Sequence, residues 1–386
     1  MMQFAPEVTW RRSRRGLVVC GPGESPLLVE HAHAGVLPEL ITEARDRDHL
    51  AALLGGSSSD GQLVADLIEE RILADGRIPA VPEERTRRLA FTRSGLEVSG
   101  IDTVARWVHQ LVSPVVNSWL GRLLLISILV GGLVSLLAGR PNAPQVSAHP
   151  WMDATLGLAI SYACAALHEL AHAVTLVHYG RSARRAGCGF YWGSLCFYVD
   201  CSDGITLPRR ARVINALAGL GVEIILVAIL LIAAQLSTSV LLVSVCWRVA
   251  ILTLLGILEN ALPILEVDGH VALSDYLDEP DLGPRAREAL SRKLRRIPHN
   301  DQPSWLATYG AVSVIGGILL LITGTWIWWS AAGSLITSLF DGNLTEILLG
   351  LLTVVPFAVG TLFSLAGLAI ELVATPRAEC DRAAVD

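Results

Sequence analysis

The sequence has few charged side chains: Asp, Glu, Lys and Arg make up 17% of its 386 residues, whereas 52% are hydrophobic. This composition is too apolar for an ordinary soluble domain and is typical of a membrane protein. Arginines follow the first residues without a long apolar segment behind them, so we expect no N-terminal signal peptide. A uniformly basic segment is also lacking, because Glu83 to Arg88 mixes acids with arginines. This pattern argues against nucleic acid as a partner.

The seven cysteines are an odd number and form no Cys-x-x-Cys pair. Their scatter excludes a disulfide framework and favours reduced thiols in a cytosol-facing membrane protein. A second metal site at Cys188, Cys196 and Cys201 is an alternative interpretation of three of them.

Apolar segments of about 20 residues can cross a bilayer as helices. Six segments qualify, at about 120–138, 154–177, 213–234, 239–263, 305–329 and 347–374. The sequence therefore predicts a mainly α-helical, polytopic transmembrane bundle of about six spans in residues 120–375. We expect a juxtamembrane helix in 101–119 and a cytosolic tail in 376–386.

Arginines cluster in two of the predicted loops, between the second and third spans and between the fourth and fifth. Arg140 is the only arginine or lysine in the other loops, which are 140–153, 235–238 and 330–346. Because basic loops stay on the cytosolic side, we expect a multi-pass protein of the cell membrane with both termini in the cytosol.

Residues 1–100 have the composition of a soluble domain. Their pattern predicts a small α+β domain that is winged-helix-like, and the order of its elements resembles the peptide-recognition domains that bind leader peptides. That likeness implies a precursor peptide as a partner. The expected elements are strands at Trp10–Val19 and Leu27–Val29, helices at Pro38–Arg45, His49–Leu54 and Asp60–Ala74, and a hairpin of Arg88–Phe91 with Leu96–Val98.

The segment His168-Glu169-Leu-Ala-His172 lies inside the second predicted span. Ionisable side chains at such a depth are either paired or functional. His168 and His172 are four residues apart and share one helix face, so both can bind one Zn²⁺. Glu169 is then placed as a general base. The alternative is a histidine pair satisfied by neighbouring helices.

A second motif, Asn260-Ala-Leu-Pro263-Ile-Leu-Glu-Val-Asp268-Gly269-His270, ends the fourth span. Catalytic zinc usually has three protein ligands, and Asp268 is the natural third. Asn260 is a candidate donor to a substrate oxyanion. In the predicted orientation, His168 lies roughly 14 Å and His172 roughly 8 Å from the cytosolic end of the second span. Asp268 lies just beyond the cytosolic end of the fourth span, on the same side of the membrane.

Together the two motifs resemble the site-2 protease family of intramembrane zinc metalloproteases. Four further sequence segments resemble the peptide zinc metalloprotease subgroup of this family. The resemblance as a whole covers roughly residues 120–288. It implies zinc bound by His168, His172 and Asp268, and a peptide substrate hydrolysed with the help of Glu169 and Asn260. His270 replaces the subgroup's aromatic residue, which leaves open whether it joins the metal. The subgroup segments are Tyr198-Val-Asp200-Cys-Ser-Asp203, Pro208-Arg209-Arg210, Ala218-Gly219 and Leu273-Ser274-Asp275.

Three other expectations concern polar residues outside the motifs. Glu223 and Arg248 fall at matching depths, which predicts an ion pair. Asp200 and Asp203 are expected to hold their loop through Arg209 or Arg210. The aromatic loop 186–207 is either an interfacial anchor or an edge strand that receives the substrate.

The leading hypothesis is a zinc endopeptidase that removes the leader of a ribosomally synthesised peptide, as in a daptide-like pathway. The alternatives are proteolysis of an anti-sigma factor or another membrane protein, and a non-catalytic export or immunity protein. A metal transporter is disfavoured, because the membrane-depth histidines gather at one site rather than along a path.

Overall fold

The computed structural model describes residues 2–341 apart from short gaps, and four isolated positions (344, 347, 351 and 362) after them. The predicted sixth span and the tail therefore lie almost wholly outside the described residues. The gaps are 5–7, 14–15, 22–26, 30–35, 70–71, 76–88, 93–94, 142–149, 192–193, 280 and 297–302.

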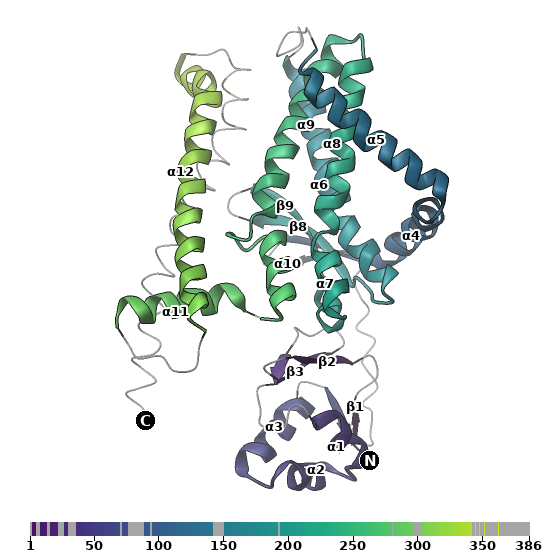
Figure 1. The fold of residues 1–386 in the computed structure, drawn as a ribbon, viewed down its shortest axis with the longest axis vertical. Helices are drawn as coiled ribbons and strands as arrows, with labels where there is room; N and C mark the ends of the chain where they lie inside the picture. Colours follow the sequence, from purple (N-terminus) through teal and green to yellow (C-terminus); the bar gives the residue numbers. More distant parts are fainter. Residues whose placement is uncertain are drawn as a thin grey trace.

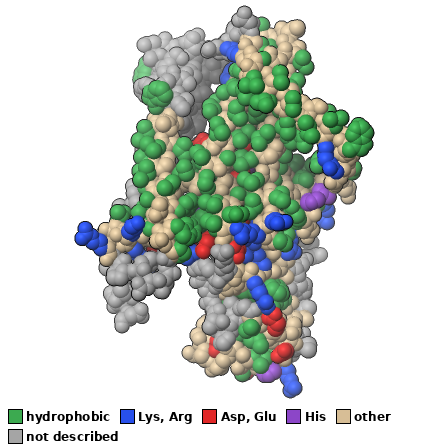
Figure 2. All heavy atoms as spheres, viewed as in Figure 1, with side chains coloured by type: hydrophobic (Ala, Val, Ile, Leu, Met, Phe, Trp, Pro, Cys, Tyr) green, Lys and Arg blue, Asp and Glu red, His purple; other side chains and the backbone are tan. Residues whose placement is uncertain are grey.

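Within the described residues, five helical segments are long and apolar enough to cross a membrane, so the chain is a multi-pass membrane protein. They are Trp119–Ala138, Met152–His178, Arg209–Leu236, Val240–Ala261 and Ser304–Trp326. These agree with the first five predicted spans. Figure 2 shows the hydrophobic side chains covering the helical part and basic ones gathering where it meets the N-terminal module.

The central bundle consists of α6 (Pro150–His178), α8 (Ala218–Leu236) and α9 (Val240–Ala261), which pack against one another (Figure 1). α5 (Trp119–Ala138) packs on α8, where a Cβ on Gly132 would fall 2.4 Å from that of Ala228. The glycine therefore permits this close helix contact. α12 (Ser304–Asp341) packs mainly against α11 (Leu282–Leu294) and lies to one side of the bundle.

Residues 2–75 form a separate N-terminal module at one end of the bundle (Figure 1). Its helices are α1 (Leu37–Glu43), α2 (Arg47–Leu54) and α3 (Ser58–Glu69). Leu17, Ile41, Leu50 and Val64 are part of its buried core. The strands are β1 (Met2–Phe4), β2 (Thr9–Ser13), β3 (Gly16–Cys20), β4 (Leu27–Val29) and β5 (Leu73–Asp75), in sheets ordered β1-β5 and β2-β3-β4.

The predicted helices of this module are confirmed in place, but two predicted elements were wrong in extent. Trp10–Val19 is not one strand, because it folds back as the β2–β3 hairpin. The helix predicted for Asp60–Ala74 ends at Glu69, and Leu73–Asp75 pairs with β1 instead. Tertiary strand pairing thus overrides a local helical pattern.

The predicted hairpin of β6 (Leu89–Thr92) and β7 (Gly95–Ser99) forms, but not as part of the N-terminal module. β7 pairs with β8 (Arg185–Tyr191), which pairs with β9 (Ser194–Val199), giving a sheet ordered β6-β7-β8-β9. The strand expected in the loop 186–207 is therefore present, with β9 at the sheet edge beside α6. The winged-helix prediction is not confirmed, because its expected wing belongs to this sheet.

The remaining elements connect the sheet to the bundle. α4 (Ile101–Asn117) precedes the first span, as predicted, and packs on α6. A 3-10 helix, η1 (Ser202–Thr206), and α7 (Arg209–Ala216) lead from β9 into α8. α10 (Asp268–Leu277) follows α9 and packs on α7. The end of α6, α7 and the start of α10 are thereby brought together.

Candidate metal centre

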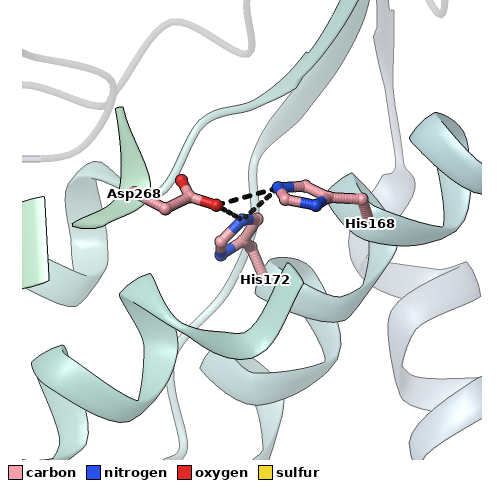
Figure 3. Close-up of side chains that lie close together, drawn as sticks. All are labelled: His168, His172 and Asp268. Carbon is pink, nitrogen blue, oxygen red and sulfur yellow. Dashed lines mark hydrogen bonds and ion pairs between the residues drawn. The ribbon is translucent and has the colours of Figure 1, made fainter. Parts of the chain in front are cut away.

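α6 places His168 and His172 one turn apart on the face that it turns toward α8 and α7. Both side chains are buried, with 8% and 7% of the residue surface exposed. Their Nε2 atoms are 3.3 Å apart (Figure 3). The four-residue spacing therefore does aim both rings at one point, as the sequence predicts.

Asp268 is the first residue of α10 and completes the cluster. Its Oδ2 lies 2.9 Å from Nε2 of His168 and 3.6 Å from Nε2 of His172 (Figure 3). Burial opposes ionisation of this carboxyl, but the two imidazoles outweigh it and hold the pKa of Asp268 well below its usual range. Asp268 is therefore an anion at neutral pH, as a metal ligand must be.

The geometry of these three residues fits a metal ion. Ligand atoms about 2.0–2.1 Å from a tetrahedral zinc lie about 3.3 Å from one another. The three observed separations, 2.9, 3.3 and 3.6 Å, scatter around this value. Two imidazoles and one carboxylate are also a donor set found at catalytic zinc. Among the described residues, His168, His172 and Asp268 are the group with ligand atoms close enough to hold an ion.

The junction between α9 and α10 fixes Asp268 in place. α9 ends at Ala261, just before Pro263, whose ring prevents a regular helix from continuing. The Asn260 side chain spans the junction: Nδ2 donates to Oδ2 of Asp268 at 3.0 Å, and Oδ1 accepts from its backbone N–H at 3.1 Å. A Cβ on Gly269 would lie 2.3 Å from the Ala261 carbonyl oxygen, so only glycine fits there.

These contacts give Asn260 a clear structural function. Both of its polar side-chain atoms bind Asp268, so it positions the third ligand. Its expected hydrogen bond to a substrate oxyanion stays a prediction.

The outer nitrogens of the two histidines have different partners. Nδ1 of His172 lies 2.7 Å from the backbone carbonyl of Asn215 in α7, and Nδ1 of His168 lies 3.3 Å from Oε1 of Glu223 in α8. The His172 contact is a hydrogen bond that favours a free Nε2 lone pair facing the cluster, whereas the His168 contact is a charge contact without hydrogen-bond alignment. Asn215 was not identified from the sequence, where nothing distinguishes its backbone carbonyl.

A cavity of about 410 Å³ adjoins the cluster and is lined in part by Glu169, His172 and Asp268. The Glu169 carboxylate also lies beside the backbone of Val199 at the end of β9. Toward the N-terminal module, the lining includes Arg11, Arg212, Asp275 and Asp278. Glu169 is thus next to both histidines of the cluster and lines the cavity.

The N-terminal module docks at this cavity through Arg11. Its guanidinium donates to Asp278 at 2.7 Å and to the Ile205 carbonyl at 2.6 Å. Arg212, which is buried, binds both Asp275 and Asp278, at 2.6 and 2.9 Å. Burial opposes ionisation of Asp278, but Arg11 and Arg212 outweigh it and lower the pKa of this carboxyl.

Two expected ion-pair arrangements were wrong. Glu223 and Arg248 do not pair, because Arg248 binds Asp153 and Glu223 contacts His168. Matching depth along two helices does not determine the direction in which each side chain points. Asp200 and Asp203 hold their loop, but without arginines: their carboxylates accept backbone N–H groups of Ser202 and Ser182.

Among the described residues, His270 and the cysteines are not part of the ligand cluster. The imidazole of His270 contacts the Tyr309 hydroxyl at 2.8 Å, and burial lowers its pKa. Cys188 pairs across the hairpin with Phe197, and Cys196 with Gly189. Since neighbouring residues in a strand point to opposite faces, these two thiols face apart and do not form the alternative metal site. Burial raises the pKa of the Cys201 thiol to about 12.

No protein-family model, curated protein or solved structure matches the chain.

Proposed function

We propose that the chain is a membrane-embedded zinc endopeptidase. The observation that carries this proposal is the convergence of His168, His172 and Asp268 on one point, with Glu169 beside them at a cavity. A structural zinc site has four protein ligands, whereas three leave a position for a reacting water. The carboxylate next to such a site matches the arrangement of zinc peptidases.

The residues of the chain divide the reaction between them. A bound zinc ion would supply Lewis acidity to a water molecule and to the scissile carbonyl. Glu169 accepts the proton of the attacking water and then delivers it to the leaving amine. Asn260 and Gly269 keep Asp268 in position.

The proposed substrate is a peptide presented from the cytosolic side, with maturation of a ribosomally synthesised precursor as the favoured case. The N-terminal module supports this choice, since its Arg11 lines the same cavity as Glu169. The module also contacts both arginine-rich segments, through Arg184, which donates to the Gly21 carbonyl at 3.0 Å, and through Asp278. This contact agrees with a cytosolic position for the module.

A direct test uses the full-length chain in lipid nanodiscs with a proteome-derived peptide library. Mass spectrometry would detect new peptide termini with zinc, after chelation and after zinc is restored. We expect cleavage that follows the zinc content and disappears in Glu169→Gln. Cleavage that survives chelation, or that Glu169→Gln performs as well as the unaltered chain, would contradict the proposal. Absence of both bound zinc and cleavage would favour the non-catalytic export or immunity protein.

A further inference from the structure

α8 brings one carboxylate to the outer side of the ligand cluster. Glu223 lies in the membrane-crossing part of α8, and its Oε1 is 3.3 Å from Nδ1 of His168. The other ring nitrogen, Nε2, faces His172 and Asp268. The imidazole of His168 is therefore contacted on both sides, by the cluster at one nitrogen and by Glu223 at the other.

Among the described residues, no lysine or arginine forms an ion pair with Glu223. An unpaired charge in a membrane span is energetically unfavourable, so a carboxylate is not expected there without a partner. Arg248 of α9 binds Asp153 instead. Among the described residues, the ion-pair contact that the structure gives Glu223 is with His168. Glu223 therefore does not neutralise Arg248, and its contact with His168 needs another explanation.

The shape of α8 supports the same conclusion. Gly219 precedes Glu223 by four residues, so the two share one helix face. A Cβ on Gly219 would lie 2.3 Å from Nε2 of His168, whereas one on Gly221 would meet nothing within 4 Å. The close approach is thus confined to the face toward the histidine. One turn of α8 leaves room for the ring, and the next turn supplies the carboxylate.

We infer that Glu223 is a positioning residue for the metal site, a role that rests on the proposed zinc-dependent function. Its Oε1 lies 3.3 Å from Nδ1 of His168 without hydrogen-bond alignment, so it acts by charge: it favours the tautomer with the proton on Nδ1, whose Nε2 lone pair is free for the ion. The carboxylate also makes the imidazole a stronger donor than His172, whose Nδ1 faces the neutral Asn215 carbonyl. The two histidine ligands are therefore unequal, and α8 is part of the metal site although it supplies no ligand.

The test compares Glu223→Gln and Glu223→Ala in the full-length chain in nanodiscs. Zn²⁺ affinity is measured by competition with a chromophoric chelator, and Co²⁺ reports the ligand field through its visible absorption spectrum. We expect Glu223→Ala to weaken zinc binding about 10–100-fold, the usual effect of losing such a partner. Glu223→Gln keeps an acceptor oxygen but loses the charge, so its loss should be smaller and its cobalt bands should shift. Asp153→Asn, at the membrane carboxylate that Arg248 binds, should change neither.

A double-mutant comparison identifies the histidine through which Glu223 acts. In a His168→Gln background, Glu223→Gln should weaken cobalt binding no further, whereas in a His172→Gln background its effect should persist. Equal effects in both backgrounds would overturn the assignment. So would Glu223 variants that lose only thermal stability and keep the zinc affinity and cobalt spectrum of the unaltered chain. If the unaltered chain bound no zinc, the proposed function would fail first, and this inference with it.

Discussion

Among the described residues of the membrane bundle, α6 contributes side chains to two polar clusters. The ion-pair cluster, near the start of α6, consists of Asp153, Ser244 and Arg248. The ligand cluster, near the end of the helix, consists of His168, His172 and Asp268. In the ion-pair cluster, Arg248 and Ser244 donate to the carboxylate of Asp153, so donors match acceptors. In the ligand cluster, three groups that can offer lone pairs face one another.

This difference distinguishes polar residues that stabilise the membrane bundle from polar residues that can bind a ligand there. A polar group in a span must be neutralised, and a complementary pair does this without further requirements. A group of lone-pair donors is neutralised best by a cation from outside the chain. The cavity beside Glu169 and His172 gives the ligand cluster space for a reacting molecule. The two clusters are therefore expected to respond differently to every change below.

Removal of the proposed base should produce the largest contrast. Glu169→Gln should lower the rate of zinc-dependent peptide cleavage by about 10²–10⁴-fold, because proton transfer is lost. Its zinc content should stay unchanged, since Glu169 is not one of the three ligands. Arg248→Gln should cleave at close to the normal rate once folded. Quantitative mass spectrometry of the peptide products measures the rate. Comparable losses in both variants would remove the distinction between the clusters.

Removal of a ligand should separate metal binding from stability. His172→Ala should weaken zinc binding by more than the 10–100-fold typical of an outer partner, because a direct ligand is lost. Asp153→Asn should keep the zinc affinity but lose roughly 2–3 kcal/mol of stability, the cost of leaving Arg248 unpaired in the membrane. Chelator competition and thermal unfolding in nanodiscs give the two quantities. Zinc retained by His172→Ala would argue against the ligand cluster.

A matched pair of glycines tests how closely α8 approaches His168. Gly219→Ala places a methyl group against the ring and should weaken zinc binding about tenfold by displacing the ligand. Gly221→Ala, two residues further along, meets open space and should leave zinc binding unchanged. It should also stabilise the helix by up to about 1 kcal/mol. The same chelator competition compares the two. Equal zinc affinities would mean that the ring is free to move away.

The ion pairs of Asp278 lie outside the spans and make docking of the N-terminal module depend on pH. We expect this to be the smallest of the four effects. Because the folded-state pKa of Asp278 is lowered, its contribution to docking of the N-terminal module is present above the ordinary pKa of about 4. It should be lost as the pH falls through the lowered value. The protection of β2 against hydrogen–deuterium exchange, expressed relative to the intrinsic exchange rate at each pH, should therefore decrease at acid pH. In Arg11→Gln, β2 should already exchange faster at neutral pH, and the acid response should shrink.

Two parts of the ligand cluster were predictable because their geometry is local, whereas the meeting of α6 with α10 was expected from the common direction of their spans and from the family resemblance. The spacing of His168 and His172 sets their direction on any helix, and Asn260 through Gly269 form one short junction. Both features therefore keep their form whatever the surrounding packing. The first five spans are predictable for a similar reason, since bilayer thickness sets their length.

Features that depend on helix rotation or distant pairing were not predictable. Glu223 and Arg248 were assigned to each other by depth, but the rotation of α8 turns Glu223 toward His168. The β6–β7 hairpin was assigned to the N-terminal domain, yet its partner β8 lies far along the chain. In both cases the contact joins two elements that are far apart in the sequence. Local sequence patterns do not predict how such elements are oriented relative to each other.

X-ray absorption at the zinc edge, on the purified full-length chain, tests the central claim most directly. We expect about one zinc per chain, with nitrogen and oxygen neighbours at about 2.0–2.2 Å and the scattering pattern of two imidazoles. His168→Ala should lose an imidazole signal or the metal itself. A chain without zinc, or zinc bound through sulfur at about 2.3 Å, would contradict the account.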